Sequence, residues 1–309
     1  MDDMVSIKPL VSVIVPNYNY EAYLDVRMES ILAQTYDNFE VIFLDDCSSD
    51  GSLNVIEKYK NNPHLKKIVC NDANSGSPFV QWEKGLGLAE GEYVWIAESD
   101  DFCSADFLEK VMAPCITDPL CTLSFSASEK VDEKGVSLGI HPNQRKMHSI
   151  KTCGRKFAKK YLSRKNCVVN ASSAVFKRSA ALSLDNGYDG YRGLGDQVFW
   201  AGLALLGNVA YTEEPLNSFR FHSSNVTAGI KTTMQGLKET ALMANYLRDC
   251  NIADKSDFRY HSVIVLYSLK YRSPKGPQEV GDEIKNLLKP DAIVKIMVIL
   301  KRIKRLLLD

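Results

Sequence analysis

Each of three apolar runs in the first hundred residues is followed by polar or acidic side chains. These segments are Pro16-Asn17-Tyr18-Asn19, Asp45-Asp46-Cys47-Ser48-Ser49-Asp50-Gly51 and Glu98-Ser99-Asp100-Asp101. Crowded carboxylates repel one another unless a cation lies among them, and oxygen ligands suit Mg²⁺ or Mn²⁺ better than zinc. An aromatic ring at a neighbouring position can stack on a base. The three segments together suggest a nucleotide-diphosphate ligand with a divalent metal.

The apolar runs predict strands of an open α/β sheet. Val11–Val15, Phe39–Leu44 and Tyr93–Ala97 are apolar on both faces, and stretches of helical period lie between them. This pattern is typical of a mostly parallel sheet covered by helices. Because such sheets bind ligands at the carboxyl ends of their strands, the three polar segments are expected along one edge. Each segment alone would also be explained as a cap for the helix that follows it.

Composition and simple motifs exclude several other functions. Lys plus Arg and Asp plus Glu both number 38, so the chain has no net positive charge that would favour binding of nucleic acid. No uncharged apolar run reaches 18 residues, and the acidic first residues do not resemble a secretory signal, so a cytoplasmic location is expected. None of the eight cysteines forms a C-x-x-C pair, which disfavours a zinc cluster. Gly85–Gly91 follows a helical stretch instead of a strand, so it is not a dinucleotide-binding loop.

Four motifs, in the right order, resemble those of the family 2 glycosyltransferases, which have the GT-A fold. They are Val11-Ser12-Val13-Ile14-Val15-Pro16-Asn17-Tyr18-Asn19, Ser30-Ile31-Leu32-Ala33-Gln34-Thr35, Leu44-Asp45-Asp46-Cys47-Ser48-Ser49-Asp50-Gly51-Ser52 and Glu92-Tyr93-Val94-Trp95-Ile96-Ala97-Glu98-Ser99-Asp100-Asp101. The resemblance is strong over residues 10–110 and absent after 230. It implies a donor-binding subdomain at 1–110 and a subdomain for the acceptor and catalytic base at 111–230. A C-terminal helical region is expected at 231–309.

On the donor side, the resemblance implies that Tyr18 packs on the nucleobase and that Asp46 accepts a hydrogen bond from the base edge. Asp100 would bind the metal. Glu98 stands at the first position of the family's D-x-D motif, where it would contact the ribose or the metal. The other residues expected beside the nucleotide are Pro16, Asn74 and Ser99, although turn chemistry alone would also explain Asn74-Ser75-Gly76.

On the acceptor side, the segment from Gly195 to Trp200 resembles the family's acidic dipeptide segment, with glycine at the position of the first acid. Asp196 is implied to be the general base that deprotonates the acceptor hydroxyl, although it could instead cap a helix. Phe219–His222 predicts a short strand, and residues 219–225 resemble a Y-R-x-H-x-x-N segment. His222 there could reach the diphosphate or the metal, or be an ordinary half-buried histidine, and Arg220 could brace a carboxylate.

The C-terminal segment Ala292–Leu308 predicts a basic amphipathic helix. Its isoleucines and leucines fall on one side and its five basic residues on the other. Such a helix suits an anionic membrane surface, which would place the protein at the inner face of the cytoplasmic membrane. A helix that covers the core, or an oligomer contact, would also explain the pattern.

These features predict an inverting, non-processive glycosyltransferase (EC 2.4, hexosyltransferase type) that acts in polysaccharide biosynthesis. It would use Mg²⁺ or Mn²⁺ and move one sugar from a nucleotide-diphosphate sugar, with UDP as the expected nucleotide. The acceptor would be a hydroxyl of a glycan or of a lipid-linked saccharide. Two alternatives stay open: a sugar-1-phosphate nucleotidyltransferase, which would need a Gly-rich basic loop where Asn17-Tyr18-Asn19-Tyr20 stands, and a non-enzymatic scaffold that binds a nucleotide sugar.

Overall fold

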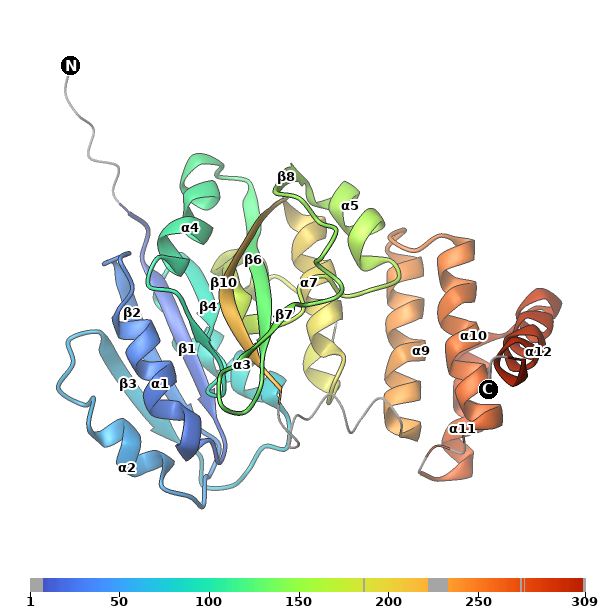
Figure 1. The fold of residues 1–309 in the computed structure, drawn as a ribbon, viewed down its shortest axis with the longest axis horizontal. Coiled ribbons are helices and arrows are strands. Elements are labelled where there is room, and N and C mark those ends of the chain that lie inside the picture. The colour runs from blue at the N-terminus through green and yellow to red at the C-terminus, as the bar shows by residue number, and fades with distance from the viewer. Residues whose placement is uncertain (1–7, 186, 222–232, 273, 275, 308–309) are drawn as a thin grey trace.

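A computed structural model describes residues 8–185, 187–221, 233–272, 274 and 276–307. Its centre is one sheet of ten strands with helices on both faces (Figure 1). The strands are β1 (Val11–Asn17), β2 (Phe39–Asp45), β3 (Leu65–Cys70), β4 (Tyr93–Ile96), β5 (Phe102–Cys103), β6 (Cys121–Val131), β7 (Ser137–Ile140), β8 (Ile150–Cys153), β9 (Ala174–Lys177) and β10 (Asn208–Arg220). Eight of them lie in the order β3-β2-β1-β4-β9-β6-β10-β5.

Most of the sheet runs in one direction. β3, β2, β1 and β4 are parallel neighbours, and β6 and β10 run the same way beyond the antiparallel β9. The short strands β5, β7 and β8 pair antiparallel to β10 or β6. The open, mostly parallel α/β sheet expected from the sequence is therefore confirmed.

Side chains that alternate along the strands build one hydrophobic cluster on each face of the sheet. On one face, Val13 and Val15 of β1 pack with α1 and α4, while Ile14 on the other face packs with α3 and α7. The helices of the sheet domain are α1 (Glu21–Leu32), α2 (Ser52–Glu57), α3 (Pro78–Leu88), α4 (Phe107–Thr117), α5 (Gly154–Phe157), α6 (Arg178–Leu182) and α7 (Gly195–Leu206). Shorter helical turns are η1 (Ala158–Leu162), η2 (Ala171–Ser173) and η3 (Tyr188–Gly190).

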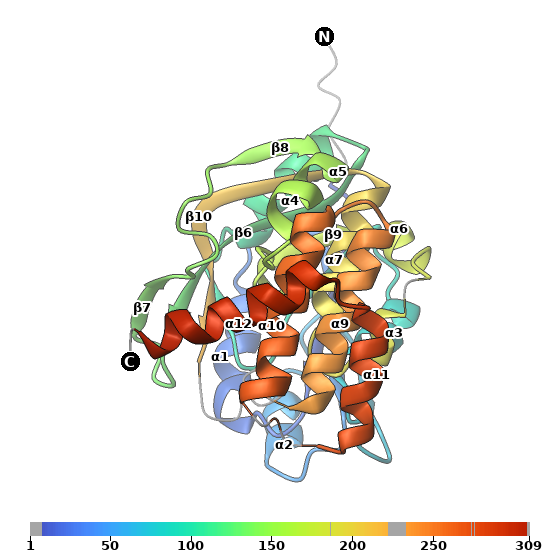
Figure 2. The ribbon, with the colours of Figure 1, turned by 90° about the vertical axis from the view of Figure 1, so that its right-hand side faces the viewer.

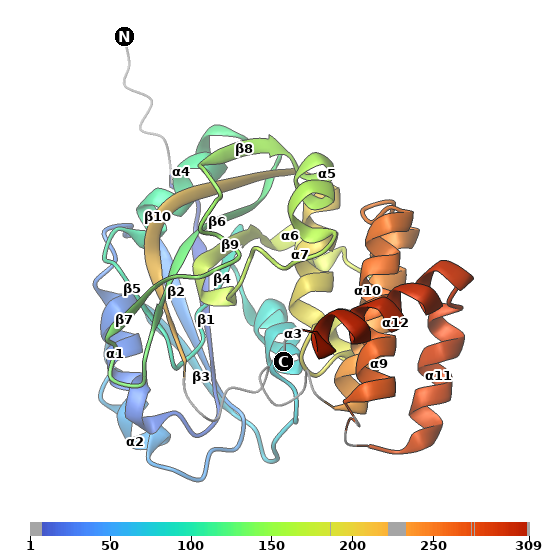
Figure 3. The ribbon, with the colours of Figure 1, turned by 45° about the vertical axis from the view of Figure 1, so that its right-hand side comes forward.

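In the described part of the chain, four helices follow the sheet domain and stand beside it. They are α9 (Met234–Asp249), α10 (Lys255–Tyr271), α11 (Gln278–Leu288) and α12 (Ala292–Leu306). α9 lies next to α7 and shares the hydrophobic cluster of the sheet domain through Met243 and Leu247 (Figure 3). α12 is the outermost helix and lies across α10 (Figures 1 and 2). None of the described helices is both long enough and apolar enough to cross a bilayer.

The structure corrects two expectations about elements. A short strand was expected at 219–222, but β10 begins at Asn208 and ends at Arg220. The polar residues and the proline in the middle of β10 hide it in the sequence, and the pairing with β6 shifts register at that point. The C-terminal helix was considered as a cover for the core, yet most of its apolar side is exposed.

Candidate functional site

The carboxyl ends of β1, β2 and β4 lie side by side, because these strands are parallel neighbours. Asn17 ends β1 opposite Asp45 at the end of β2, and its side-chain amide donates to Asp45 Oδ1 at 3.0 Å. On the other side of β1, the Ala97 N–H donates to the Ile14 carbonyl at 2.8 Å. The three polar segments therefore meet at one edge of the sheet, as the sequence predicted.

Asp46 is nearly fully buried, and its carboxylate already accepts several hydrogen bonds. Oδ1 accepts from Asn71 Nδ2 at 2.6 Å and from Gln81 Nε2 at 2.8 Å. Oδ2 accepts from the Ser75 hydroxyl at 2.8 Å, and the Asn74 amide donates to the Asp46 carbonyl at 3.2 Å. Asp46 thus fixes the turn that carries Asn74. Contacts of both residues with a nucleotide stay predictions.

Three carboxylates gather in the loop after β4: those of Glu98, Asp100 and Asp101. Burial, together with the negative charge of Asp100, raises the pKa of Glu98 to about 8. The same two causes raise the pKa of Asp101. Trp82 Nε1 of α3 donates to Glu98 Oε1 at 3.1 Å. The loop is therefore crowded with negative charge that its surroundings compensate only in part.

Two side-chain hydrogen bonds connect this acidic loop to neighbouring segments of the sheet domain. Ser99 is fully buried, and its hydroxyl donates to the Pro16 carbonyl at 2.8 Å, which joins the loop to β1. Asn170 Nδ2 donates to Asp101 Oδ2 at 2.8 Å. The side chain of Ser99 is thus used within the protein, and its expected place beside the nucleotide stays a prediction.

Arg220, at the end of β10, braces the acidic loop through main-chain atoms. Its Nε donates to the Asp100 carbonyl at 2.8 Å, and its NH1 group donates to the carbonyls of Asp132 and Glu133 at 3.2 and 2.8 Å. Its own N–H donates to Asp101 Oδ1 at 2.9 Å. Arg220 therefore joins β10, the acidic loop and the turn between β6 and β7, whereas its bracing of a carboxylate, considered from the sequence, stays a prediction.

Two residues at this edge were not singled out from the sequence. Tyr20 lies beside the acidic loop. Burial and the negative charges of Asp100 and Glu98 raise the pKa of its hydroxyl. Arg27 of α1 is fully buried, and its guanidinium nitrogens have no oxygen or nitrogen partner for a hydrogen bond among the described residues. It lies over the ring of Trp95 at 4.9 Å, and its positive charge opposes the rise in the pKa of Glu98. By contrast, the Tyr18 side chain is 46% exposed at the strand end.

Asp196 lies in the first turn of α7 and is tied to a neighbouring loop. Asn166 Nδ2 donates to Asp196 Oδ2 at 2.8 Å, and the Gln197 N–H donates to Oδ1 at 2.8 Å. The loop that carries Asn166 continues to Asn170, which contacts Asp101, and to Ser172, whose Oγ accepts from the Glu98 N–H at 3.0 Å. This segment, residues 166–172, therefore joins the candidate base to the acidic loop.

The carboxylates of Glu98, Asp100 and Asp101 are of the type that binds Mg²⁺ or Mn²⁺. Within the described ranges, no three Asp, Glu, His or Cys side chains converge on a ready-made metal site. His222, the second predicted metal ligand, lies outside the described residues. The raised pKa of Glu98 nevertheless fits a place for a cation, since a positive charge there would relieve the repulsion between the carboxylates.

Residues 12–182, more than half of the chain, match the model of glycosyl transferase family 2. The chain belongs to this family. TuaG of Bacillus subtilis, a glycosyltransferase named for teichuronic acid biosynthesis, is 34% identical over 135 residues, which cover 44% of this chain and 53% of TuaG. EpsH of the same organism, also named a glycosyltransferase, is 26% identical over 294 residues, 90% of this chain and 82% of EpsH.

The poly(ribitol-phosphate) β-N-acetylglucosaminyltransferase TarS of Staphylococcus aureus is 39% identical over 104 residues. This match covers 33% of the chain but only 18% of TarS, so the chain spans about half of TuaG and less than a fifth of TarS. Crystalline TarS 1–349 with UDP-GlcNAc aligns with a TM-score of 0.63 at 20% identity, covering 84% of this chain and 72% of that one.

A mannosyltransferase from Pyrobaculum calidifontis, in complex with GDP-Man and Mn²⁺, aligns with a TM-score of 0.55 at 15% identity. The alignment covers 94% of this chain and 84% of that one. At such identities the two solved structures establish the fold, which is that of the GT-A glycosyltransferases. The family and fold expected from the sequence motifs are thus confirmed.

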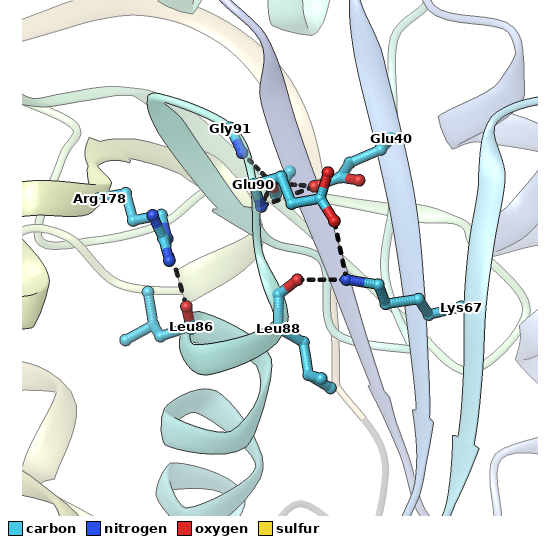
Figure 4. A network of polar contacts seen from close by, with 8 residues as sticks. Glu40, Lys67, Leu86, Leu88, Glu90, Gly91 and Arg178 are labelled. Atoms are coloured by element: carbon cyan, nitrogen blue, oxygen red, sulfur yellow. Dashed lines mark hydrogen bonds and ion pairs between the residues drawn. The ribbon is translucent and has the colours of Figure 1, made fainter.

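This family 2 chain also contains a polar network at the opposite, amino-terminal end of the same strands (Figure 4). Glu40 Oε1 accepts from the Ser12 hydroxyl at 2.6 Å and from the Glu90 N–H at 2.9 Å. Lys67 donates to the Glu90 carboxylate at 3.1 Å and to the Leu88 carbonyl at 2.8 Å. The network joins the end of α3 to β1, β2 and β3, away from the strand ends that form the candidate site.

Some of the supporting residues had a signal in the sequence. Arg27 falls on the apolar positions of its helix, together with Leu24, Met28 and Ile31, so it was a charged residue in a buried pattern. Asn166 and Asn170 gave no comparable signal, because they lie in a segment without periodicity and contact their partners only after folding.

Proposed function

We propose that this protein is an inverting glycosyltransferase that moves one sugar from a nucleotide-diphosphate sugar, with UDP as the expected nucleotide, to a hydroxyl of a glycan or lipid-linked acceptor. The observation that carries the proposal is the segment 166–172, which joins Asp196 to the acidic loop after β4. An in-line displacement requires a donor site and a proton acceptor that are held in a fixed position relative to each other.

Each group of residues then has a distinct task. Tyr18 is exposed at the end of β1, where its ring is available to a nucleobase. Asp196 takes the proton of the attacking hydroxyl as the new bond forms, which contributes ~10²–10⁴ in rate. Asn166 orients that carboxylate by donating to Oδ2.

Asp100, with Glu98 beside it, would hold Mg²⁺ or Mn²⁺. When bound, the ion supplies positive charge to the diphosphate leaving group. The Mn²⁺ in the complex of the Pyrobaculum calidifontis mannosyltransferase supports a metal-dependent reaction. His222 is the second ligand that we propose from the sequence.

A thermal-shift panel tests the donor directly. The panel contains UDP-glucose, UDP-galactose, UDP-GlcNAc, UDP-GalNAc and GDP-mannose, each with Mn²⁺ and with EDTA. A ligand at a hundredfold excess over its Kd stabilises the folded state by ~2.7 kcal/mol, which is readily measured. We expect a shift with at least one UDP-sugar that requires Mn²⁺, followed by UDP release on incubation. Metal-dependent binding without any UDP release would favour a non-enzymatic scaffold.

The exposed face of α12 supports a second proposal, that the protein contacts an anionic membrane at the inner face of the cytoplasmic membrane. Val294 and Val298 pack on α10, while the remaining apolar residues face outward. The exposed set is Ile293, Ile296, Met297, Ile299, Leu300, Ile303, Leu306 and Leu307. At 100° per residue, Lys295 borders this face on one side, and Lys304 lies near its other edge, between Ile293 and Met297. An apolar face with lysines at its edges is typical of helices that lie in an anionic lipid surface.

The basic residues on the other side of α12 have partners within the protein. Lys301 lies 5.1 Å from the centroid of the Tyr267 ring, and Arg302 lies 5.3 Å from that of Tyr271. These contacts turn the apolar residues away from α10. Insertion of the exposed isoleucines and leucines into the lipid boundary would therefore need no change in the fold.

Vesicle flotation tests the contact. We expect the full chain to float with phosphatidylglycerol vesicles and much less with phosphatidylcholine vesicles. The triple variant Ile296→Ser, Leu300→Ser and Ile303→Ser should lose flotation with little change in melting temperature, because these side chains pack against little. Equal flotation of the triple variant would refute the membrane contact. A triple variant that instead turns a dimer into a monomer would assign the face to a second copy.

A further inference from the structure

Glu239 of α9 is a buried carboxylate that reaches from the C-terminal helical region into the sheet domain. Its Oε1 accepts from the Arg192 N–H at 2.9 Å, and its Oε2 accepts from the N–H groups of Gly193 and Leu194 at 3.0 and 3.2 Å. Gln235, one turn earlier on α9, donates to Oε1 at 3.0 Å. Four hydrogen bonds thus satisfy a carboxylate that is almost inaccessible to solvent.

The three main-chain groups that Glu239 binds lead directly into α7. Leu194 is the N-cap residue of α7 and has no side chain that could cap the helix. A negative charge at this position also favours the helix dipole. Asp196 follows two residues later in the first turn. Glu239 therefore fixes the main chain from which the candidate base projects.

The same turn is also closely packed at Gly195. A Cβ atom on Gly195 would lie 2.3 Å from the Tyr188 carbonyl and 2.9 Å from the Phe79 ring, so only glycine fits there. The turn is thus packed against η3 and α3 and is also bound by Glu239.

We propose that Glu239 is a positioning residue for Asp196, and that α9 is for this reason part of the catalytic apparatus. The inference rests on the proposed function, because it assumes that Asp196 is the base. It also assigns a task to a region in which no family motif was recognised. Figure 3 shows α9 directly beside α7, in the position that this task requires.

The test compares Glu239→Gln with Glu40→Gln. Both positions are buried carboxylates that accept main-chain N–H groups, but Glu40 belongs to the network at the far end of the strands (Figure 4). In Glu239→Gln the new NH₂ group faces main-chain donors, so the turn should loosen. Because a displacement of about 1 Å can cost ~10²-fold in rate, we expect kcat to fall 10- to 100-fold. UDP binding in Mn²⁺, followed by calorimetry, should stay within about twofold of the parent, because the hydrogen bonds of Glu239 to described residues go to 192–194 and Gln235 and not to the acidic loop or the turn at Asp46.

Hydrogen exchange gives a readout that does not depend on activity. The amides of residues 192–194 should exchange faster in Glu239→Gln and at the parent rate in Glu40→Gln. Turnover is followed as UDP release from the UDP-sugar that gives the largest thermal shift. The inference is overturned if Glu239→Gln and Glu40→Gln have the same kcat, or if UDP binding weakens as much as kcat does. Failure of the proposed base is separate: Asp196→Asn would then turn over at the parent rate, whatever Glu239→Gln does.

Discussion

At the scale of residues, the site is defined by carboxylates in different surroundings. Glu98 has a pKa of about 8 because of burial and the charge of Asp100. Asp196 is held instead by Asn166 and by the main-chain N–H of Gln197. Asp46 is occupied by donors from its own turn. We propose that the first carboxyl contacts a cation and that the second takes the proton, whereas the third fixes the turn that carries Asn74 and is predicted to contact the nucleotide.

The raised pKa of Glu98 predicts the direction of a pH effect on stability. In EDTA, the folded state holds a proton on Glu98 that the unfolded chain releases at lower pH, so the free energy of unfolding should fall as the pH rises from about 5 to about 8. Glu98→Gln should flatten this dependence and be more stable than the parent at pH 8. Urea unfolding at several pH values measures both. An equally steep fall in the variant would show that Glu98 does not titrate in this way.

Asn166 allows a test of how the base is oriented. Asn166→Asp keeps the size of the side chain but places a negative charge beside Asp196 Oδ2, which favours the protonated form of that carboxyl. The acid limb of the pH–rate profile should therefore move to higher pH. Asn166→Ala should lower kcat roughly tenfold without that displacement, because a freely rotating carboxylate is less well aimed. An unchanged profile in both variants would mean that Asn166 does not act on the base.

At the scale of elements, the strands within residues 10–110 were predicted well from the sequence. Strand β10 and the contacts that connect the candidate site to other segments were predicted poorly. The runs at Val11, Phe39 and Tyr93 became β1, β2 and β4 because strands buried on both faces are continuous in apolar residues. β10 was missed over most of its length, because polar residues interrupt its pattern. The contacts of Asn166 and Glu239 could not be predicted, since they join segments 30 and 45 to 47 residues apart in the sequence.

Arg220 is the residue through which β10 stabilises the acidic loop. Arg220→Lys keeps the charge but cannot donate to the carbonyls of Asp100, Asp132 and Glu133 at once. We expect a loss of roughly 2–4 kcal/mol in the free energy of unfolding, since buried acceptors lose charged donors. UDP binding in Mn²⁺ should also weaken, because the loop that carries Asp100 is released. Urea unfolding and calorimetry on the same samples would detect both; parent-like stability would contradict the bracing role.

At the scale of the whole molecule, the two ends of the helical region have different tasks. α9 packs on the sheet domain and contacts the turn before Asp196. Among the described residues, the hydrophobic cluster that contains Val294 and Val298 of α12 is otherwise formed by α10 alone. α10 lies between α9 and α12 (Figure 1). The helical region would thus connect the catalytic base with the lipid surface where a lipid-linked acceptor is found.

Removal of α12 alone should separate these tasks. A chain that ends at Lys289 keeps α9, α10 and α11, so its UDP binding and its turnover with a soluble acceptor should match the full chain. Flotation with phosphatidylglycerol vesicles should be lost, because each basic residue near an anionic surface contributes ~1 kcal/mol. If the shortened chain fails to fold, α12 is needed for the fold, and if it still floats, the lipid contact lies elsewhere.

The measurement that tests the central claim most directly is a comparison of binding and turnover in Asp196→Asn. Asparagine has the same size and can still accept the Gln197 N–H, so the fold and the UDP affinity in Mn²⁺ should stay close to the parent. The transfer rate should fall by ~10²–10⁴, because the variant cannot take the proton of the acceptor hydroxyl. Transfer at the parent rate would contradict the assignment of Asp196 as the base. A loss of UDP binding would place Asp196 in the donor site instead.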